Sequence, residues 1–266
     1  MIRDITLGQY FQADSFIHRL DPRVKVIATL LFIIELFIID SFIGFGVCAA
    51  VLITTVIISK VPFSFIFRGM KPILIILIFT FMLNMFMLDG TVIWQWKFLH
   101  ITDRGLYMAA FMGIRLIMLI VGASLLTFTT TPIRLTDGME RLMSPLAAVR
   151  VPTHEIAMMM SIALRFVPTL LDEADKIIKA QQARGADFES GNILARAKAL
   201  IPILVPLFIS AFRIAQDLAI AMEARCYHGG QGRTRLHSMK FQSRDYVTMA
   251  LLFAFLGLVI CMKIWF

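Results

Sequence analysis

The amino-acid sequence predicts an all-α polytopic membrane protein, with about five transmembrane helices and long cytoplasmic amphipathic helices. Of its 266 residues, 59% are hydrophobic and 17% are charged, whereas a soluble domain is about 45–50% apolar and about 25% charged. The apolar residues form runs long enough to cross a hydrocarbon core of about 30 Å. No run shows the period-two alternation of a half-buried strand, so we expect these runs to be helices.

The apolar runs divide into five predicted spans. Residues 26–59 form one stretch, interrupted only by Glu35 and by Asp40 and Ser41. A single helix of that length would extend about 50 Å, which exceeds the hydrocarbon core. We therefore predict two short spans that turn at Asp40 and Ser41. The other predicted spans are residues 73–88, 106–127 and 246–266.

The basic residues predict the orientation of the chain. Its formal net charge is +8, which would also suit a nucleic-acid partner, but lysine and arginine lie between apolar runs rather than along one stripe. If the N-terminus is inside, 22 of the 26 basic residues fall on the inner side and three fall on the outer side. This bias predicts a cytoplasmic N-terminus, five spans and an external C-terminus.

A charged block separates the fourth span from the last. Residues 133–245 hold 15 of the 26 basic residues and 11 of the 18 acidic residues. Within this block, segments 156–171 and 199–222 are apolar enough to be spans, but each contains charge and proline, so helices at the membrane surface are favoured. The predicted domains are a four-span N-terminal region (1–131), a cytoplasmic coupling-helix domain (132–245) and a last transmembrane helix (246–266).

The charged block contains an approximate repeat whose two units end in alanine, arginine and a small residue. Each unit is predicted to be a helix opened by proline, Pro168 in the first and Pro206 in the second. One arginine before glycine is typical of an ordinary helix end. Two copies favour a docking role, because a guanidinium offers five donors in a rigid fork. The candidate docking residues are Ala183, Arg184, Gly185, Ala224, Arg225 and Cys226.

Several other charged residues are candidates for structural or coupling roles. Asp21 suits a helix N-cap and Pro22 the first helical position, which predicts a cytoplasmic anchor or a clamp onto the central helices. A charge inside a span is costly unless it is paired, and Glu35 is a candidate partner for Arg115. The candidate charges are Arg19, Asp21, Arg23, Arg115 and Arg165.

The sequence offers no catalytic, metal-binding or cofactor-binding pattern. Cys48, Cys226 and Cys261 are far apart and follow no ligand spacing. The glycine-rich segment 229–232 is not followed by the Gly-Lys-Ser/Thr of a phosphate-binding loop. We therefore expect no catalytic residue, metal or cofactor in this chain.

Short motifs spread over nearly the whole chain carry a family resemblance. They are residues 15–25 (SFIHRLDPRVK), Arg115 with residues 129–132 (TTTP), residues 163–168 (ALRFVP), and the Ala-Arg-Gly and Ala-Arg-Cys endings at 183–185 and 224–226. Together they resemble the transmembrane T component of energy-coupling factor (ECF) transporters. The second ending departs from the family pattern because Cys226 stands in place of glycine.

The resemblance implies a non-catalytic scaffold in the bacterial cytoplasmic membrane. Arg184 and Arg225 would each anchor one of two ATP-binding-cassette subunits, and those subunits would bind ATP and Mg. A separate membrane subunit would bind the solute, a vitamin or metal-ion micronutrient. A stand-alone membrane channel or secondary carrier is the alternative, although the spans lack the broken helices that carriers use. An intramembrane enzyme would need a catalytic constellation that the sequence does not offer.

Overall fold

The computed structural model describes residues 10–71, 73–96, 99–149, 151–186, 188, 192, 194, 198–229 and 239–265. Contacts divide the chain into two compact units. We call Gly8–Gly138 with Met239–Phe266 the bundle unit, and the unit that contains Met139–Ser238 the arm unit. The two dividing points lie within seven residues of the predicted domain boundaries at 131/132 and 245/246.

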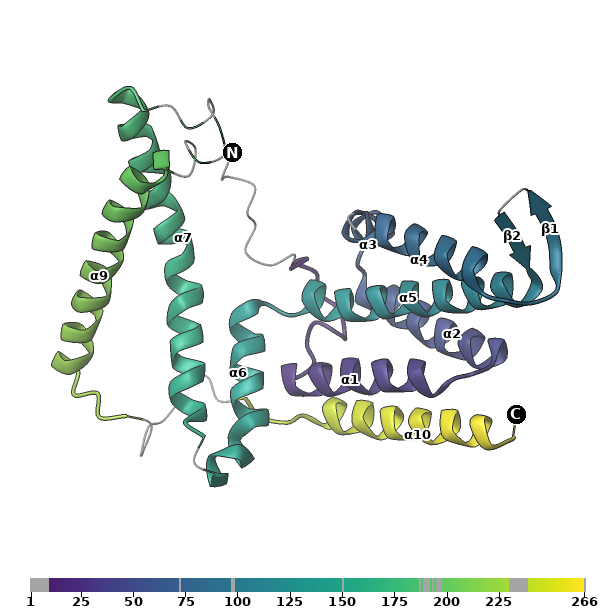
Figure 1. Ribbon diagram of the computed structural model, residues 1–266. Helices are drawn as coiled ribbons and strands as arrows, with labels where there is room; N and C mark the ends of the chain where they lie inside the picture. Colours follow the sequence, from purple (N-terminus) through teal and green to yellow (C-terminus); the bar gives the residue numbers. More distant parts are fainter. Residues whose placement is uncertain are drawn as a thin grey trace. The chain divides into compact units, whose positions relative to one another are not determined.

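The bundle unit contains a helix at each of the five predicted spans (Figure 1). The predicted turn at Asp40 and Ser41 is confirmed, because one helix ends at Ile38 and the next begins at Phe42. The Ser41 hydroxyl accepts a hydrogen bond from the Gly44 amide at 3.2 Å and so caps the second helix. The helices are α1 (Pro22–Ile38), α2 (Phe42–Ser59), α3 (Phe63–Met70), α4 (Leu74–Met87), α5 (Asp103–Thr129) and α10 (Ser243–Trp265).

Helix α5 is the central element of the bundle unit. It packs against α1, α2, α3 and α4, and nine of its 27 residues are buried. At Gly122 it lies so close to α1 that a Cβ atom would come within 2.7 Å of the Phe32 ring. The buried apolar core, which includes Leu36, Phe45 and Phe128, is therefore arranged around α5.

A short β-hairpin joins α4 to α5 and was not predicted. Strand β1 (Val92–Trp96) pairs antiparallel with β2 (Leu99–Thr102). The Thr102 hydroxyl donates to the Leu88 carbonyl at 2.7 Å and accepts from the Gly105 amide at 3.0 Å, which fixes the hairpin to the neighbouring helices. The expectation of no strand is wrong here. Leu99–Thr102 alternates apolar and polar residues over only four positions, and Val92–Trp96 does not alternate, so the pair gives a weak strand signal. The all-α polytopic class is confirmed.

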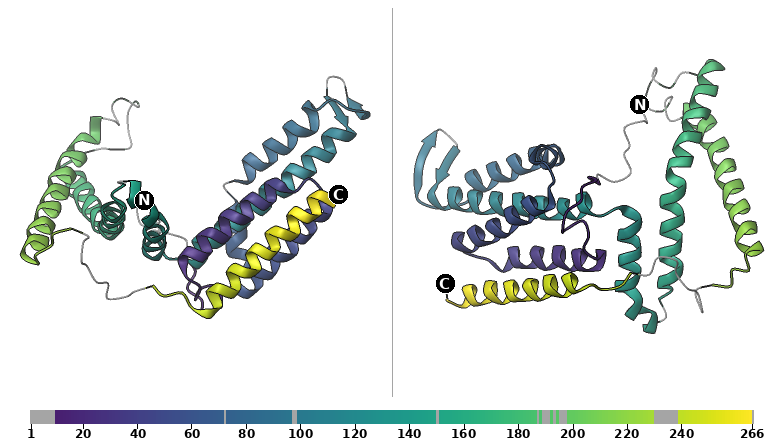
Figure 2. Two further views of the ribbon diagram at one scale, coloured as in Figure 1. Left: turned by 90° about the horizontal axis from the view of Figure 1, so that it is seen from below. Right: turned by 180° about the vertical axis from the view of Figure 1, so that it is seen from behind.

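The arm unit consists mainly of two long helices, α7 (Thr153–Ala183) and α9 (Ile201–Ala224). They are reached through α6 (Pro132–Met143), which crosses the boundary between the units, and a 3-10 helix (Ser144–Val149). The views in Figures 1 and 2 show α7 and α9 side by side and antiparallel. The side-chain amide of Gln181 donates a hydrogen bond to the backbone carbonyl of Pro202 at 3.3 Å, so the end of α7 lies beside the start of α9.

The two prolines of the repeat lie inside these helices. Pro168 is in the middle of α7 and Pro206 is in the second turn of α9. The prediction that proline opens each helix is therefore wrong. An interior proline removes one backbone hydrogen bond and costs about 3 kcal/mol or more. Helix α7 continues for 15 residues on each side of Pro168, and α9 continues for 18 residues after Pro206.

Five helices of the described residues are long and apolar enough to cross a membrane. They are α2, α5, α7, α9 and α10, and α3 with α4 makes a sixth if the bent pair counts as one span. The predicted number is the same but the set differs: α1 with 17 residues and α4 with 14 residues are too short by themselves, whereas α7 and α9 pass the test. Length and hydropathy do not distinguish a span from an apolar helix at the membrane surface.

One end of the bundle unit is held by buried polar contacts that we call the N-terminal clamp (Ser15, His18, Asp21, Lys25, Thr129 and Asp245). Lys25 is 7% exposed. Its amine donates to the carbonyl of Thr129 at 2.8 Å and to the carbonyl of His18 at 3.3 Å. Because Thr129 is the last residue of α5, one lysine ties the N-terminal segment, α1 and α5 together.

Asp245 completes the clamp from α10. It is 2% exposed, and its carboxylate accepts hydrogen bonds from the amides of Asp21 at 3.0 Å and Gln242 at 2.8 Å. On the same side, Arg23 forms a 2.8 Å ion pair with Asp21 and lies 3.9 Å from the centroid of the Phe241 ring. The first and last helices of the bundle unit therefore begin at one point.

His18 contributes to the clamp in its neutral form. Its Nε2 lies 3.0 Å from the Phe11 carbonyl, which only accepts, so Nε2 carries the proton and Nδ1 accepts from the Ser15 hydroxyl at 2.7 Å. Burial lowers the pKa of His18, and the nearby Lys25 amine lowers it further. The neutral imidazole suits this buried position.

We predict that Lys25→Met will destabilise the protein. Methionine fills a similar volume but leaves the carbonyls of Thr129 and His18 without their donor, which costs about 1–3 kcal/mol. The thermal midpoint of the purified chain in detergent should fall. Lys179→Met, at an exposed lysine of α7, is the matched control and should leave the midpoint unchanged. Equal midpoints for both variants would contradict the role of the clamp.

Candidate docking site

The first candidate docking end is the C-terminus of α7. The amide of Gly185 donates to the Gln182 carbonyl at 2.9 Å, and the amide of Ala186 donates to the Gln181 carbonyl at 3.0 Å. These two bonds define a Schellman motif, in which the residue after the cap takes a left-handed conformation. Gly185 does so with φ of 87°. Arg184 is the cap residue itself and is exposed.

The second candidate docking end, at the C-terminus of α9, has the same backbone geometry. The amide of Cys226 donates to the Glu223 carbonyl at 2.9 Å, and the amide of Tyr227 donates to the Met222 carbonyl at 3.1 Å. Cys226 is left-handed with φ of 56° although it is not glycine. Arg225 is again the exposed cap residue. The substitution of cysteine for glycine therefore leaves the shape of the end unchanged.

The match between the two ends was only partly predictable. The sequence indicated that Gly185 would supply a left-handed end, but it gave no such indication for Cys226. The signal was present in the repeat itself, because both helices end in alanine, arginine and a small residue. The structure places all six candidate docking residues at exposed positions, three on each helix end.

The antiparallel arrangement places the two arginine ends far apart. Arg184 lies near the start of α9, as the bond from Gln181 to Pro202 indicates, whereas Arg225 is at the other end of α9. The 24 residues of α9 correspond to about 36 Å of helix. Two ends at such a distance suit two separate binding grooves rather than one.

Arg115 has different partners from the predicted one. Its guanidinium donates to the Ile39 carbonyl at 2.8 Å, and Ile39 caps the C-terminus of α1, where the helix dipole favours a cation. The guanidinium carbon also lies 4.9 Å from the Phe111 ring centroid and 5.6 Å from that of Phe45. No ion pair joins Arg115 to Glu35 among the described residues.

The remaining candidate charges are distributed over both units. Arg19 pairs with Asp14 on the surface, and Asp21 and Arg23 belong to the clamp region. Among the described residues, segment 15–25 is hydrogen-bonded to the end of α5 and to the start of α10. Arg165 is exposed on α7. Sequence reasoning missed Lys25 and Asp245, although a charged residue at the edge of a span was a usable signal.

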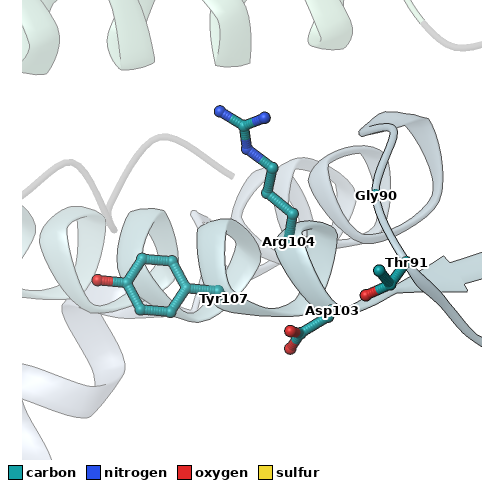
Figure 3. A pocket seen from close by; sticks show the side chains of 5 residues that line it. All are labelled: Gly90, Thr91, Asp103, Arg104 and Tyr107. Atoms are coloured by element: carbon teal, nitrogen blue, oxygen red, sulfur yellow. The ribbon is translucent and has the colours of Figure 1, made fainter.

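A pocket of about 360 Å³ lies at the hairpin end of α5. It is lined by Gly90, Thr91, Asp103, Arg104 and Tyr107. Figure 3 shows that the guanidinium of Arg104 points away from the carboxylate of Asp103, and that the hydroxyl of Tyr107 lies apart from both groups. The polar groups do not converge on one point. Among the described residues there is also no group of three or more metal-ligating side chains.

These features define a multi-pass α-helical membrane protein with a pair of long helices that end in matching arginine caps. Comparison with known proteins gives the same class. The model of the cobalt transport protein (CbiQ) family matches residues 13–236. The chain belongs to this family, as the transmembrane T component of an energy-coupling factor transporter.

Relatives from several bacteria carry the name energy-coupling factor transporter transmembrane protein EcfT. The protein from Clostridium kluyveri is 54% identical over 267 residues, which cover 100% of this chain and 99% of the relative. The protein from Thermosediminibacter oceani is 55% identical, with 92% of each chain covered. The Bacillus subtilis protein is 46% identical over 92% of this chain and 93% of its own length.

We predict opposite effects for two substitutions at the helix ends. A Cβ atom on Gly185 would meet nothing within 4 Å, so Gly185→Ala costs only conformational energy, about 1 kcal/mol. Cys226→Gly relieves a similar cost. Hydrogen–deuterium exchange of the last turn should therefore rise in α7 for the first variant and fall in α9 for the second.

The matched control for these substitutions is Gly46→Ala. That glycine also has open space around its Cβ position, but its φ is not left-handed, so the exchange of α7 and α9 should not change. If Gly185→Ala leaves the exchange of α7 unchanged, the left-handed cap does not stabilise this helix end.

Proposed function

We propose that this chain is the non-catalytic coupling scaffold of an ECF-type importer. In this proposal, two ATP-binding-cassette subunits dock on the arginine ends of α7 and α9, and a separate membrane subunit binds the solute. The observation that carries the proposal is the pair of exposed arginines on identical Schellman ends. A fixed backbone holds each guanidinium at the tip of a long helix, where it can enter an acidic groove of a partner.

The separation of the two ends supports two cassette subunits. One groove could not accept both Arg184 and Arg225, because the length of α9 lies between them. Cassette subunits that move together on binding ATP would therefore act on opposite ends of one antiparallel helix pair. In this mechanism the cassette subunits close on binding ATP, and the resulting movement of α7 and α9 is transmitted to the solute-binding subunit.

The chemistry of transport is assigned to the partners. The sequence of this chain contains no phosphate-binding loop, so ATP and Mg belong to the cassette subunits in this proposal, and this chain is not an enzyme. The solute is proposed to be a vitamin or metal-ion micronutrient. The bias of basic residues supports a cytoplasmic N-terminus in the bacterial cell membrane.

We predict that Arg184→Glu and Arg225→Glu will each weaken the association with cassette subunits. Charge reversal replaces attraction to an acidic groove by repulsion, and the double variant should lose both the complex and ATP-dependent uptake. Co-purification in mild detergent and uptake into vesicles measure the two effects. Arg213→Glu, at an exposed arginine within α9, is the control for the change of charge and should retain both.

Two results would contradict this proposal. If the wild-type chain binds no cassette subunit and moves solute by itself, a stand-alone channel or carrier is the better description. If the double variant assembles and transports like the wild type, the arginine ends are not the docking residues.

Docking of both ends inside the cell requires that α7 and α9 do not cross the membrane. We therefore predict that Cys226 and a cysteine introduced by Ala186→Cys are labelled from the same, cytoplasmic side by an impermeant maleimide. Cys226 is exposed in the structure, and each cysteine should be tested alone, in a chain without the other thiols. Labelling of position 186 from outside and position 226 from inside would show that both helices span.

A further inference from the structure

The connection between α2 and α4 has an unusual distribution of charge and exposure. Between Asp40 and Asp89 the sequence contains no acidic residue but three basic ones, Lys60, Arg68 and Lys71. All three are exposed. Helix α2 has 18 residues, or about 27 Å of helix, which matches the hydrocarbon core. Lys60 follows it directly and so lies at the membrane–water interface.

Helix α3 between these basic residues is amphipathic and firmly attached on one side. Its inner face carries Ile66, which is 6% exposed, and Phe65, whose ring centroid lies 5.6 Å from that of Phe11 and 5.2 Å from that of Phe128. These contacts fix α3 at the end of the bundle unit where α5 finishes. The outer face is therefore held in one orientation.

The outer face of α3 combines aromatic and basic side chains. Phe63 is 55% exposed and Phe67 is 68% exposed, and their i, i+4 spacing places them on one side of the helix. Arg68, the residue after Phe67 in α3, is also exposed. A helix with bulky apolar residues beside cations suits the boundary between acyl chains and phosphate groups.

The backbone at Lys60 supports a specific use of its side chain. Lys60 ends α2 in a left-handed conformation with φ of 56°, a position where glycine is the usual residue. The turn is held by its buried neighbours, because the Ser59 hydroxyl donates to the Val56 carbonyl at 2.6 Å and accepts from the Val61 amide at 3.3 Å. A lysine is therefore kept at a strained position that glycine would occupy at lower cost.

The nearby acidic group does not neutralise this patch. Asp14 is close enough to interact electrostatically with Lys60, but it is already paired with Arg19, which holds the pKa of Asp14 below its usual value. The charges of Asp14 and Arg19 cancel, so the three cations of the connection remain in excess.

We propose that Lys60, Arg68 and Lys71, together with Phe63 and Phe67, form a binding site for anionic phospholipids. The cations bind the phosphate of the headgroup, and the two phenylalanines enter the acyl region beside it. The site does not depend on the transport role proposed above, because it needs only that α2 crosses the bilayer. It would hold this end of the bundle unit at the surface of an anionic leaflet.

The test compares lipid retention by the purified full-length chain. The chain is exchanged into micelles with equal amounts of phosphatidylglycerol and phosphatidylcholine, washed, and the bound lipids are extracted and quantified. The variant carries Lys60→Gln, Arg68→Gln and Lys71→Gln. The control carries Lys176→Gln, Lys179→Gln and Lys198→Gln, three exposed cations of the arm unit, so both proteins lose the same charge.

We expect the wild type and the control to retain phosphatidylglycerol in preference to phosphatidylcholine. The preference should fall by roughly fivefold for each cation removed from the site, and it should weaken in high salt. Phe63→Ala with Phe67→Ala should reduce the retention of both lipids while leaving the preference in place. Only variants whose thermal midpoint equals that of the wild type are compared.

Two outcomes would overturn the proposal. The first is an unchanged lipid preference in the site variant. The second is an equal loss of preference in the control, which would mean that net charge alone attracts anionic lipid. If the site variant keeps its lipids but no longer co-purifies with a membrane partner, the patch binds protein instead, and the lipid site is wrong.

Discussion

The buried contact between Lys25 and the Thr129 carbonyl is the constraint on which the arrangement of the bundle unit depends. An amine removed from water is costly unless its hydrogen bonds are replaced, and here two backbone carbonyls replace them. The Asp245 carboxylate accepts a hydrogen bond from the Asp21 amide, which attaches the start of α10 to the same end of the bundle unit. Three segments that are distant in the sequence are therefore fixed at one end of the bundle, where α5 leads into α6.

The two helix ends show how backbone geometry can present a side chain. In each Schellman motif the cap residue is the last one before the chain reverses, so its side chain stands at the tip of the helix. Gly185 reaches the necessary conformation easily, whereas Cys226 reaches it at a cost of about 1 kcal/mol. A costly conformation at the second end indicates that the shape of this end matters more than local stability.

The sequence predicted the helices better than it predicted their partners. The turn at Asp40 and Ser41 follows from length alone, because one helix of the whole run would be too long for a bilayer. The partner of Arg115 could not be predicted in this way. A carboxylate such as Glu35 is visible in a sequence, but the carbonyl of Ile39 acts only because α1 ends beside α5.

Other misses have the same physical origin. The hairpin gives a weak periodic signal, because only the four residues of β2 alternate, and its position depends on the Thr102 contacts with the neighbouring helices. A proline often marks a helix start, but Pro168 and Pro206 lie inside long helices that continue past the one backbone hydrogen bond each proline removes. The roles of Lys25 and Asp245 could be recognised only in the folded structure, because these side chains bond to backbone groups about a hundred or more residues away.

The apolar character of α9 is compatible with a helix that does not cross the membrane. Its large exposed side chains include Leu204, Val205, Phe208, Ile209 and Phe212. At 100° per residue these five fall within an arc of about 140°; Arg213 and Asp217 lie outside this arc, whereas Gln216 and Glu223 near the end of the helix lie inside it. A span surrounded by lipid needs no such division, but a helix lying in the interface does. This distribution is compatible with the proposal that α9 lies in the interface, with its arginine end on the same side as that of α7, although its hydropathy passes the test for a span.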